Sequence, residues 1–462
     1  MALKTLEDTI AAISTPPGEG GIGIVRLSGP ESIAIVRDLF RSSTGRDIAS
    51  GKGRVFHGVI VDEQQAAVDE VLVHIMRAPH SYTREDIVEI NCHGGAGPLN
   101  AVLELVLRKG ARIAQPGEFT QRAFLNGRID LAQAEAVIDR IRASTRASLR
   151  AAGAAASGAL SSAINEIKGT LVNALAHIET SVDFPDEDLP DLVGEALRTR
   201  LLETRDRMRA LLDTAEAGRL YREGARIAIA GRPNVGKSSL FNALLRDARA
   251  IVSAQPGTTR DRIEETIALS GVPVRLADTA GLHPSEDEVE QMGIGVARDT
   301  LRSADVILFV LDVSGPAHEE DQSLAAELET LDVPVWLVLN KIDLLNPHRL
   351  EASPPHSLFS GVSRVSAKTG EGLPALEKNL GDLLLGGAAI SPDQGMITRA
   401  HQRDSLRRAA TCVDRVLDNF GASPELLSID LREAVQALGE ITGETTPEDV
   451  LETIFSTFCI GK

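Results

Sequence analysis

A strand–loop–helix pattern at residues 227–239 constrains this chain more than any other feature. These residues read IAIAGRPNVGKSS, and the loop from Gly231 to Ser238 matches G-x-x-x-x-G-K-[ST]. Glycines let backbone N–H groups converge on phosphates, and the dipole of the following helix favours anions. The pattern predicts a triphosphate-binding loop in which Lys237 reaches the β- and γ-phosphates and the Ser238 hydroxyl holds Mg²⁺. Further loop residues predicted to contact the nucleotide are Asn234, Val235, Gly236 and Ser239.

The composition predicts a soluble protein with more than one domain. A chain of 462 residues exceeds what one hydrophobic core usually serves, so we expect two to four domains. The net charge of −18 disfavours a generally basic nucleic-acid surface, so any RNA contact must be local or shared with a partner. With only 3% aromatic residues, base stacking along an open groove is also disfavoured.

Cysteine usage and the absence of long apolar runs predict a cytoplasmic location without membrane contact. The three cysteines, Cys92, Cys412 and Cys459, are far apart and lack the spacing of metal ligands. They therefore predict a reducing compartment, with neither a disulfide framework nor a zinc site. No apolar run is long enough to span a bilayer, and the first residues lack the features of a signal peptide.

Periodicity divides the chain into four segments. Residues 1–120 mix strands and helices, and residues 121–217 are Ala-rich with helical apolar spacing. Residues 218–386 alternate strands and helices, as in a doubly wound, mostly parallel sheet. Residues 387–462 are helical again. The predicted fold class is an α/β P-loop GTPase domain inserted in an α-helical domain and preceded by a smaller α+β domain.

Individual elements follow from the same patterns. In the first segment we expect strands at 9–14, 22–29, 70–76 and 86–93, and helices at 31–43 and 98–110. We expect one charged helix at 196–218, after a break at 183–190. The glycines of 18–23 form G-x-G-x-x-G, but they lead into a strand, so we reject a dinucleotide-binding role.

Four motifs after the loop occur in the order expected of a guanine-nucleotide domain. They are TT at 258–259, DTAG at 278–281, NKID at 340–343 and SAK at 366–368. The carboxylate of Asp343 can accept N1–H and the exocyclic amine of guanine, a pattern that adenine cannot offer. The predicted nucleotide and Mg²⁺ contacts in these motifs are Thr258, Thr259, Asp278, Thr279, Ala280, Gly281, Asn340, Lys341, Asp343, Ser366, Ala367 and Lys368.

Two details point to an unusual hydrolytic mechanism. Leu282 occupies the place where Ras-like enzymes have a water-orienting glutamine, and no arginine is obviously placed as an internal finger. A monovalent cation could supply the missing charge, with the Asn234 amide oxygen as a ligand. Alternatively, asparagine at this position simply tolerates an unusual backbone angle. The acidic stretch 285–290 could supply the water-orienting carboxylate, or could be an ordinary acidic helix N-terminus.

With these motifs in place, the chain resembles the MnmE (TrmE) family of tRNA-modification GTPases over essentially its full length. FLNGRIDLAQAEA within 116–136 and the terminal FCIGK are the most specific signals, because other GTPases lack them. The resemblance is carried by residues 16–29, 116–136, 183–188, 231–244, 256–261, 278–294 and 458–462.

The resemblance implies a function beyond GTP hydrolysis. Members of this family have an N-terminal domain that binds formyl- or methylene-tetrahydrofolate and forms a homodimer. With an FAD-dependent partner, MnmG, they form a heterotetramer. Together the two proteins add an aminomethyl or carboxymethylaminomethyl group to C5 of the tRNA wobble uridine.

The resemblance also implies site residues. Glu290 matches the family's water-orienting glutamate. Cys459 is either a reactive thiol or a buried small hydrophobe. The folate contacts match Arg26, Glu89, Arg128 and Lys462, and the potassium ligands match Asn234, Ser253, Gln255 and Thr258. Three positions differ from the residues that are frequent in the family: Glu19, Arg128 and His283. Many members have an arginine at the position of His283, so this chain lacks the side chain that could take part in switch motion there.

Two other functions compete with this interpretation. A stand-alone regulatory GTPase of the Era or Der type in ribosome or RNA assembly would share the central domain. It would be expected to carry a basic RNA-binding appendage, which the sequence lacks. An aminomethyltransferase that no longer depends on GTP is disfavoured, because the nucleotide motifs are intact.

Overall fold

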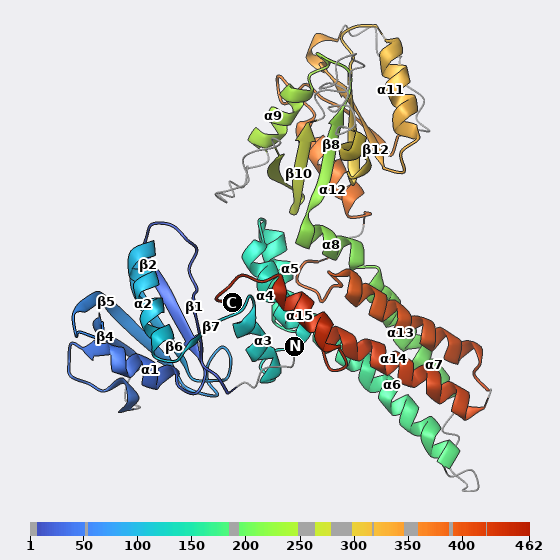
Figure 1. Cartoon of the computed structure of the whole chain (residues 1–462). Coiled ribbons are helices and arrows are strands. Elements are labelled where there is room, and N and C mark those ends of the chain that lie inside the picture. Colours follow the sequence, from blue (N-terminus) through green and yellow to red (C-terminus); the bar gives the residue numbers. More distant parts are fainter. Residues whose placement is uncertain are drawn as a thin grey trace. The chain divides into compact units, whose positions relative to one another are not determined.

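The computed structural model describes residues 7–50, 54–183, 194–247, 264–278, 298–316, 318–345, 359–387, 391–421 and 423–462. The chain forms two compact units, one of Met1–Ile138 with Gln436–Lys462 and the other of Asp139–Val435. The boundary falls inside helices α4 (Leu131–Arg142) and α14 (Pro424–Thr442), which belong to both units (Figure 1). The division into four segments stays a prediction. Within the described ranges, no helix has the length and hydropathy of a membrane span.

The first unit is built on a seven-stranded sheet with the order β3-β4-β5-β6-β2-β1-β7. Neighbouring strands are antiparallel except β1 and β7. Helices α1 (Ser32–Leu39) and α2 (Ala96–Arg108) bury their apolar sides against the sheet. The strands are β1 (Ile10–Ile13), β2 (Gly20–Ser28), β3 (Phe40–Ser42), β4 (Val55–Val61), β5 (Ala67–Met76), β6 (Ile87–Gly94) and β7 (Arg112–Ile113).

Sequence patterns predict β1, β2, β5 and β6 of this seven-stranded sheet and miss β3, β4 and β7. The helix expected at 31–43 ends at Leu39, and its last residues form β3, which pairs with β4. Strand β4 itself was not predicted. The glycines at 18–23 do lead into strand β2, as the rejection of a dinucleotide site requires.

Helices of the first unit pack the C-terminal end of the chain against its N-terminal part. Helix α3 (Glu118–Leu125) follows the sheet, and α15 (Glu448–Ser456) precedes the C-terminal tail. Phe455 and Phe458 pack with Leu131 and Ile138 of α4 in one buried cluster. This packing brings the tail to the N-terminal sheet within the same unit.

The second unit contains a six-stranded sheet with the order β13-β12-β11-β8-β10-β9. All pairs are parallel except the hairpin of β9 and β10, so the predicted mostly parallel sheet is confirmed. β9 was not predicted. The strands are β8 (Ala225–Ala230), β9 (Glu264–Leu269), β10 (Val272–Asp278), β11 (Val306–Asp312), β12 (Val335–Asn340) and β13 (Gly361–Arg364). The helices are α9 (Lys237–Asp247), α11 (Glu319–Glu329) and α12 (Leu373–Leu384), with a short 3₁₀ turn at Ile342–Leu344.

The only tryptophan of the chain, Trp336, lies on β12 in the core of this sheet. Its indole Nε1 donates a hydrogen bond of 3.0 Å to the Ser363 Oγ on β13. A Cβ at Gly361 would come within 2.2 Å of the indole ring. Glycine at this position therefore makes room for the ring between the two strands.

Helices before and after the sheet pack together in the second unit. Helix α7 (Glu195–Leu212) contacts both α6 (Ala159–Asp183) and α13 (Ala400–Asp418). The single helix predicted at 196–218 is two helices, α7 and α8 (Ala215–Glu223), and α8 runs through Gly224 directly into β8. The sheet is therefore inserted between helical segments, as predicted.

Candidate functional site

The predicted phosphate-binding loop connects β8 to α9. The Lys237 Nζ curls back over the loop and donates to the carbonyls of Gly231 (2.7 Å) and Arg232 (3.0 Å). Gly236 has a φ of 100°, and a Cβ there would lie 2.3 Å from Asn340 Nδ2. Only glycine fits this position without displacing the Asn340 side chain.

Asn340 joins the loop to the SAK segment. Its Nδ2 donates to the Val235 carbonyl (2.9 Å), and its Oδ1 accepts the Ala367 N–H (3.0 Å). The side chain is 1% exposed, so both hydrogen bonds are shielded from water. This one amide fixes the position of the two segments that were predicted to hold opposite ends of the nucleotide.

Lys341 makes a second connection to the loop. It has a left-handed backbone (φ 67°), and its Nζ donates to the Asn234 carbonyl (2.8 Å) and to Asp312 Oδ2 (2.6 Å). Burial acts to raise the pKa of Asp312, but hydrogen bonds from Lys341 and Ser314 hold it below its ordinary value. The Lys341–Asp312 ion pair thus orients the lysine along the loop.

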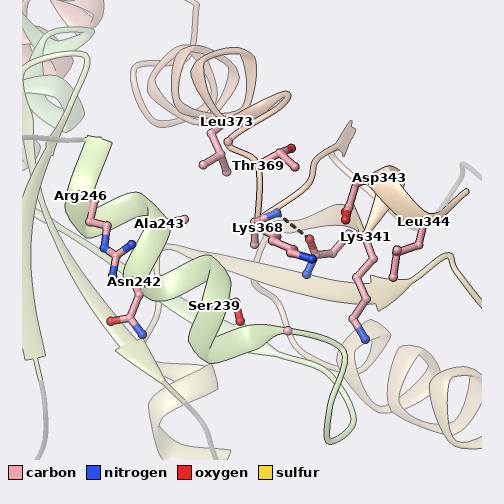
Figure 2. A pocket seen from close by; sticks show the side chains of 14 residues that line it. Ser239, Asn242, Ala243, Arg246, Lys341, Asp343, Leu344, Lys368, Thr369 and Leu373 are labelled. Atoms are coloured by element: carbon pink, nitrogen blue, oxygen red, sulfur yellow. Dashed lines mark hydrogen bonds between the residues drawn. The ribbon is translucent and has the colours of Figure 1, made fainter.

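A cavity of about 720 Å³ lies between α9 and the segments that follow β12 and β13 (Figure 2). Asp343 lines it, and its Oδ1 accepts a hydrogen bond of 2.7 Å from the buried Ser366 Oγ. The lining includes the predicted Gly236, Ser239, Asn340, Lys341, Asp343, Ala367 and Lys368, together with Asn242, Ala243, Arg246, Leu344, Thr369, Gly370 and Leu373.

The α9 residues of this lining were not predicted from the sequence. Asn242, Ala243 and Arg246 follow Ser239 at intervals of three, four and seven residues, so they share its helix face. This helical spacing is the sequence signal from which they could have been predicted. Arg246 adds a second positive charge to the cavity lining, besides Lys368.

Other predicted nucleotide contacts are placed in part. Ser238 lies in the first turn of α9, and the Asp278 backbone pairs with Ile229, at the end of β10 beside the strand that leads to the loop. Asn234 has a φ of 63°. This observed left-handed backbone supports the alternative that asparagine occurs here because it tolerates an unusual backbone angle. The remaining predicted contacts and switch residues lie outside the described residues, as does the Asp278 side chain. They are Ser253, Gln255, Thr258, Thr259, Thr279, Ala280, Gly281, Leu282, His283 and Glu290.

A second cluster of predicted residues lies in the first unit. Arg26 on β2 pairs across the sheet with Glu89 on β6 through contacts of 2.8 and 2.7 Å. The Arg26 Nη1 also donates to the Gly461 carbonyl (3.2 Å). Burial and the nearby Arg26 lower the pKa of Lys462, while Glu89 and Cys459 act in the opposite sense. The structure therefore brings Arg26, Glu89 and Lys462 together, and Arg26 contacts Gly461 from 435 residues away in the sequence.

Arg128, the fourth residue of the predicted set, lies over the Tyr82 ring at 4.8 Å. Tyr82 packs against the small core cluster that contains Phe119, and the Phe119 ring lies 5.7 Å from the guanidinium carbon of Arg26. Each of the two arginines thus lies over an aromatic ring, and the two rings belong to one packed cluster. The cation–π contact, which sequence patterns cannot show, orients Arg128.

The three cysteines differ in exposure. Cys92 and Cys412 are buried, and burial raises their thiol pKa values to about 12 and about 11. Cys459 is exposed, so it is not a buried small hydrophobe. Its carbonyl accepts the Gly117 N–H (3.3 Å), which holds this part of the tail against the N-terminal half of the unit.

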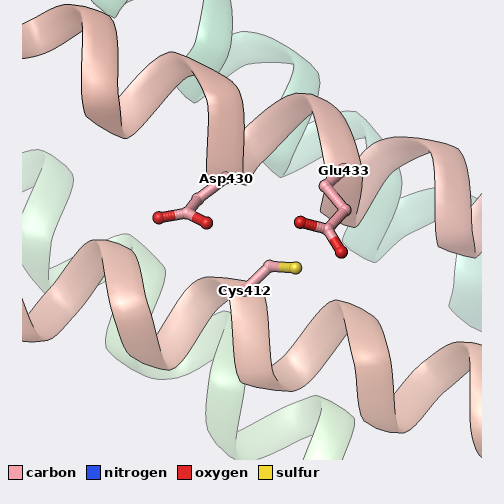
Figure 3. A group of neighbouring side chains, drawn as sticks. All are labelled: Cys412, Asp430 and Glu433. Carbon is pink, nitrogen blue, oxygen red and sulfur yellow. The ribbon is translucent and has the colours of Figure 1, made fainter.

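Cys412 also lies close to Asp430 and Glu433, an arrangement that could suggest a metal site (Figure 3). The Arg415 guanidinium already contacts all three groups. It donates to Cys412 Sγ (3.1 Å), Asp430 Oδ1 (2.8 Å) and Glu433 Oε2 (2.8 Å). The cluster is therefore an ion-pair connection between α13 and α14.

Comparison with known proteins identifies the family of the chain. A family described as "MnmE helical domain" matches residues 131–459, and one described as "GTP-binding protein TrmE N-terminus" matches residues 9–128. The chain is 47% identical to the tRNA modification GTPase MnmE of Heliobacterium modesticaldum, over 98% of this chain and 99% of the relative. It is 46% identical to the tRNA modification GTPase MnmE of Geobacillus thermodenitrificans, again over 98% and 99%. The chain therefore belongs to the MnmE (TrmE) family of tRNA modification GTPases.

Proposed function

We propose that the chain is a potassium-dependent GTPase that acts in modification of the tRNA wobble uridine. It would work as a cytoplasmic homodimer with an FAD-dependent partner of the MnmG type. The observation that supports the GTPase activity best is the Asn340 amide, which joins the phosphate-binding loop to the segment beside Asp343. A guanine base and a phosphate chain would then be held by one preorganised frame.

The loop and its neighbours would hold the two ions that hydrolysis requires. The Ser238 hydroxyl in the first turn of α9 and the end of β10 at Asp278 flank the loop, as ligands of Mg²⁺ would. The amide oxygen of Asn234 would be one ligand of K⁺. Ser253, Gln255 and Thr258 would complete that site. Mg²⁺ and K⁺ would supply positive charge to the phosphates, while Lys237 contacts the β- and γ-phosphates and Glu290 orients the water.

The cluster of Arg26, Glu89 and Lys462 supports a tetrahydrofolate site. A carboxylate suits the N–H groups of a pterin, and fixed cations suit the glutamate tail of a folate. Glu89 offers the carboxylate. The cations are offered by Arg26, Arg128 and Lys462. The exposed Cys459 lies three residues before Lys462 and is available to act on the one-carbon unit or the uridine. A pocket completed by a second copy of the chain would account for dimerisation.

Mass spectrometry of wobble uridines tests this function. A strain that lacks the gene should lose the C5 modification, and the parental chain should restore it. Lys237→Ala and Glu89→Ala should each fail to restore it, because they remove the nucleotide and the one-carbon functions separately. Unchanged uridines in the deletion strain, combined with a ribosome-assembly defect, would favour the Era-like alternative instead.

A further inference from the structure

The β9–β10 hairpin lies between two segments that were predicted to respond to the nucleotide. β9 begins at Glu264, five residues after the predicted Mg²⁺ ligand Thr259, and β10 ends at Asp278, the first residue of DTAG. The strands pair in full register from Val272–Leu269 to Ala277–Glu264. The hairpin therefore joins the two segments through one ladder of backbone hydrogen bonds, and β10 also pairs with β8 from Val274 to Asp278.

The other end of the hairpin is a tight two-residue turn at Ser270 and Gly271. Both residues have positive φ, 48° and 87°, as a type I′ turn requires. From this turn, β10 extends about 20 Å to Asp278 at the usual rise per residue. The hairpin is thus a stiff connection between the nucleotide end of the sheet and its opposite end.

The turn docks on helix α5 (Arg146–Ala156), which lies outside the nucleotide-binding fold. The buried Thr145 hydroxyl donates a hydrogen bond of 2.7 Å to the Gly271 carbonyl, and it also caps α5 by accepting the Ser148 N–H. A Cβ at Gly271 would lie 2.9 Å from the Ala147 Cβ. Backbone and helix therefore approach as closely as the absence of a side chain permits.

Core packing supports this docking. Val272 and Val274 of the hairpin share one buried cluster with Ala151 of α5 and with Leu220 and Tyr221 of α8. Thr145 follows the last residue of α4 by only three positions, and Asp139 of α4 is paired with Arg399 at 2.9 Å. Helix α4, which leads into the α5 cap, is therefore itself fixed to Arg399 within the second unit.

We propose that the β9–β10 hairpin transmits the state of the bound nucleotide to the α4–α5 junction, and that the Thr145–Gly271 hydrogen bond is the contact that couples them. The inference rests on the proposed GTP binding and assigns a route for its regulation. A nucleotide that moves the Asp278 end of the hairpin changes the strength of this contact. By linkage, the contact must in turn alter the relative affinity for GTP and GDP.

Two substitutions of Thr145 separate this role from simple capping. Thr145→Asp keeps a favourable N-cap but cannot donate to the Gly271 carbonyl, whereas Thr145→Ser keeps both functions. Ala147→Leu provides an independent disruption, because the Ala147 side chain packs against the Gly271 backbone. Parental GDP affinity in each variant shows that the nucleotide fold is intact.

Hydrogen exchange of residues 139–150 in the full chain is the test, comparing the GDP-bound protein with one bound to a non-hydrolysable GTP analogue. The parent and Thr145→Ser should show a nucleotide-dependent difference there, and Thr145→Asp and Ala147→Leu should lose it. The ratio of GTP to GDP affinity should change by about two- to tenfold in Thr145→Asp, as expected for loss of one hydrogen bond.

Several results would overturn the inference without touching the proposed function. These are a parental difference retained in Thr145→Asp, its loss in Thr145→Ser, or its absence from the parent while both nucleotides bind. Failure of the parent to bind guanine nucleotides at all would instead refute the proposed function itself.

Discussion

The Ser366 hydroxyl donates a 2.7 Å hydrogen bond to Oδ1 of Asp343, and Ser366 is fully buried while Asp343 lines the cavity beside α9. One carboxylate oxygen is thus held by the protein. The rotation of the carboxylate is fixed by this bond, so its remaining acceptor positions are preorganised for a ligand.

Asp343→Asn should exchange guanine for xanthine specificity. The amide can no longer accept both N1–H and the exocyclic amine of guanine, but its NH₂ can donate to the 2-oxo group of xanthine. GDP affinity should fall by at least about tenfold, since a hydrogen bond to a charged group is lost. Calorimetry with GDP and xanthosine diphosphate checks this, with Ser366→Ala as a milder control. Unchanged GDP affinity would place the base elsewhere.

GTP hydrolysis should be faster in KCl than in NaCl at equal ionic strength, because Asn234 would supply an oxygen ligand to the larger cation. Asn234→Ala should abolish the potassium advantage and leave nucleotide affinity nearly intact. Asn234→Gly is the better matched variant, since glycine accepts the φ of 63° without strain. If Asn234→Gly keeps the potassium advantage, the asparagine serves only the backbone. Equal parental rates in both salts would remove potassium from the mechanism.

Glu290→Ala should bind GTP normally and hydrolyse it about 10²- to 10⁴-fold more slowly, the usual range for loss of a group that manages the attacking water. Single-turnover hydrolysis measures the chemical step, and Glu288→Ala is a control from the same acidic stretch. A parental rate in Glu290→Ala would transfer the role to Glu286, Asp287 or Glu288.

Deletion of residues 459–462 should abolish tRNA modification and leave GTP hydrolysis nearly unchanged, because the tail lies outside the nucleotide motifs. Binding of a reduced folate, followed by calorimetry, should fail in Glu89→Ala and weaken about tenfold in Arg26→Ala. Since Arg26 and Glu89 are ion-paired, Glu89→Gln is needed to retain the shape of the site. Parental folate affinity in all three point variants would mean that this cluster is structural.

The first unit should lose stability in acid through a buried network around Arg122. Arg122 contacts Asp8 (2.5 Å), Glu118 (3.1 Å) and Glu85 (3.2 Å) and is almost fully buried. Burial is the largest single influence and acts to raise the pKa values of Asp8 and Glu118. For Asp8, the hydrogen bonds and charges of Arg112 and Arg122 together outweigh burial. For Glu118, the Gln115 backbone N–H adds to the hydrogen bond from Arg112 and to the charges of both arginines. Both pKa values therefore lie below their ordinary values.

A carboxyl whose pKa is lower in the folded than in the unfolded protein stabilises the fold at pH values above its ordinary pKa, which is 3.8 for Asp8 and 4.5 for Glu118. This stabilisation is lost as the pH falls through the lower pKa of the folded state. Arg122→Ala should destabilise the unit by about 3 kcal/mol at neutral pH, because it leaves carboxylates unpaired in a buried site. Urea unfolding monitored by circular dichroism measures this. An acid dependence identical in the parent and Arg122→Ala would show that other groups control it.

Local patterns predicted the parallel strands β8, β11 and β12 because each is a mostly apolar, buried run, and β8 and β12 lead directly into nucleotide motifs. They failed where pairing across the chain decides the conformation. Phe40 continues a helical pattern but joins a strand because β4 pairs with it. β9 has an antiparallel partner that no local signal shows. Arg26 and Gly461 illustrate the same limit, since only the fold brings such distant residues into contact.

Trp336 gives the nucleotide-binding sheet an optical label that the other unit lacks. As the only tryptophan of the chain, held between β12 and β13 by Ser363 and Gly361, it reports by its fluorescence on this sheet alone. Circular dichroism reports on the helices and strands of both units. A fluorescence transition that precedes or follows the dichroism transition would therefore reveal two cooperative blocks, and the stability of each could be measured in the intact chain.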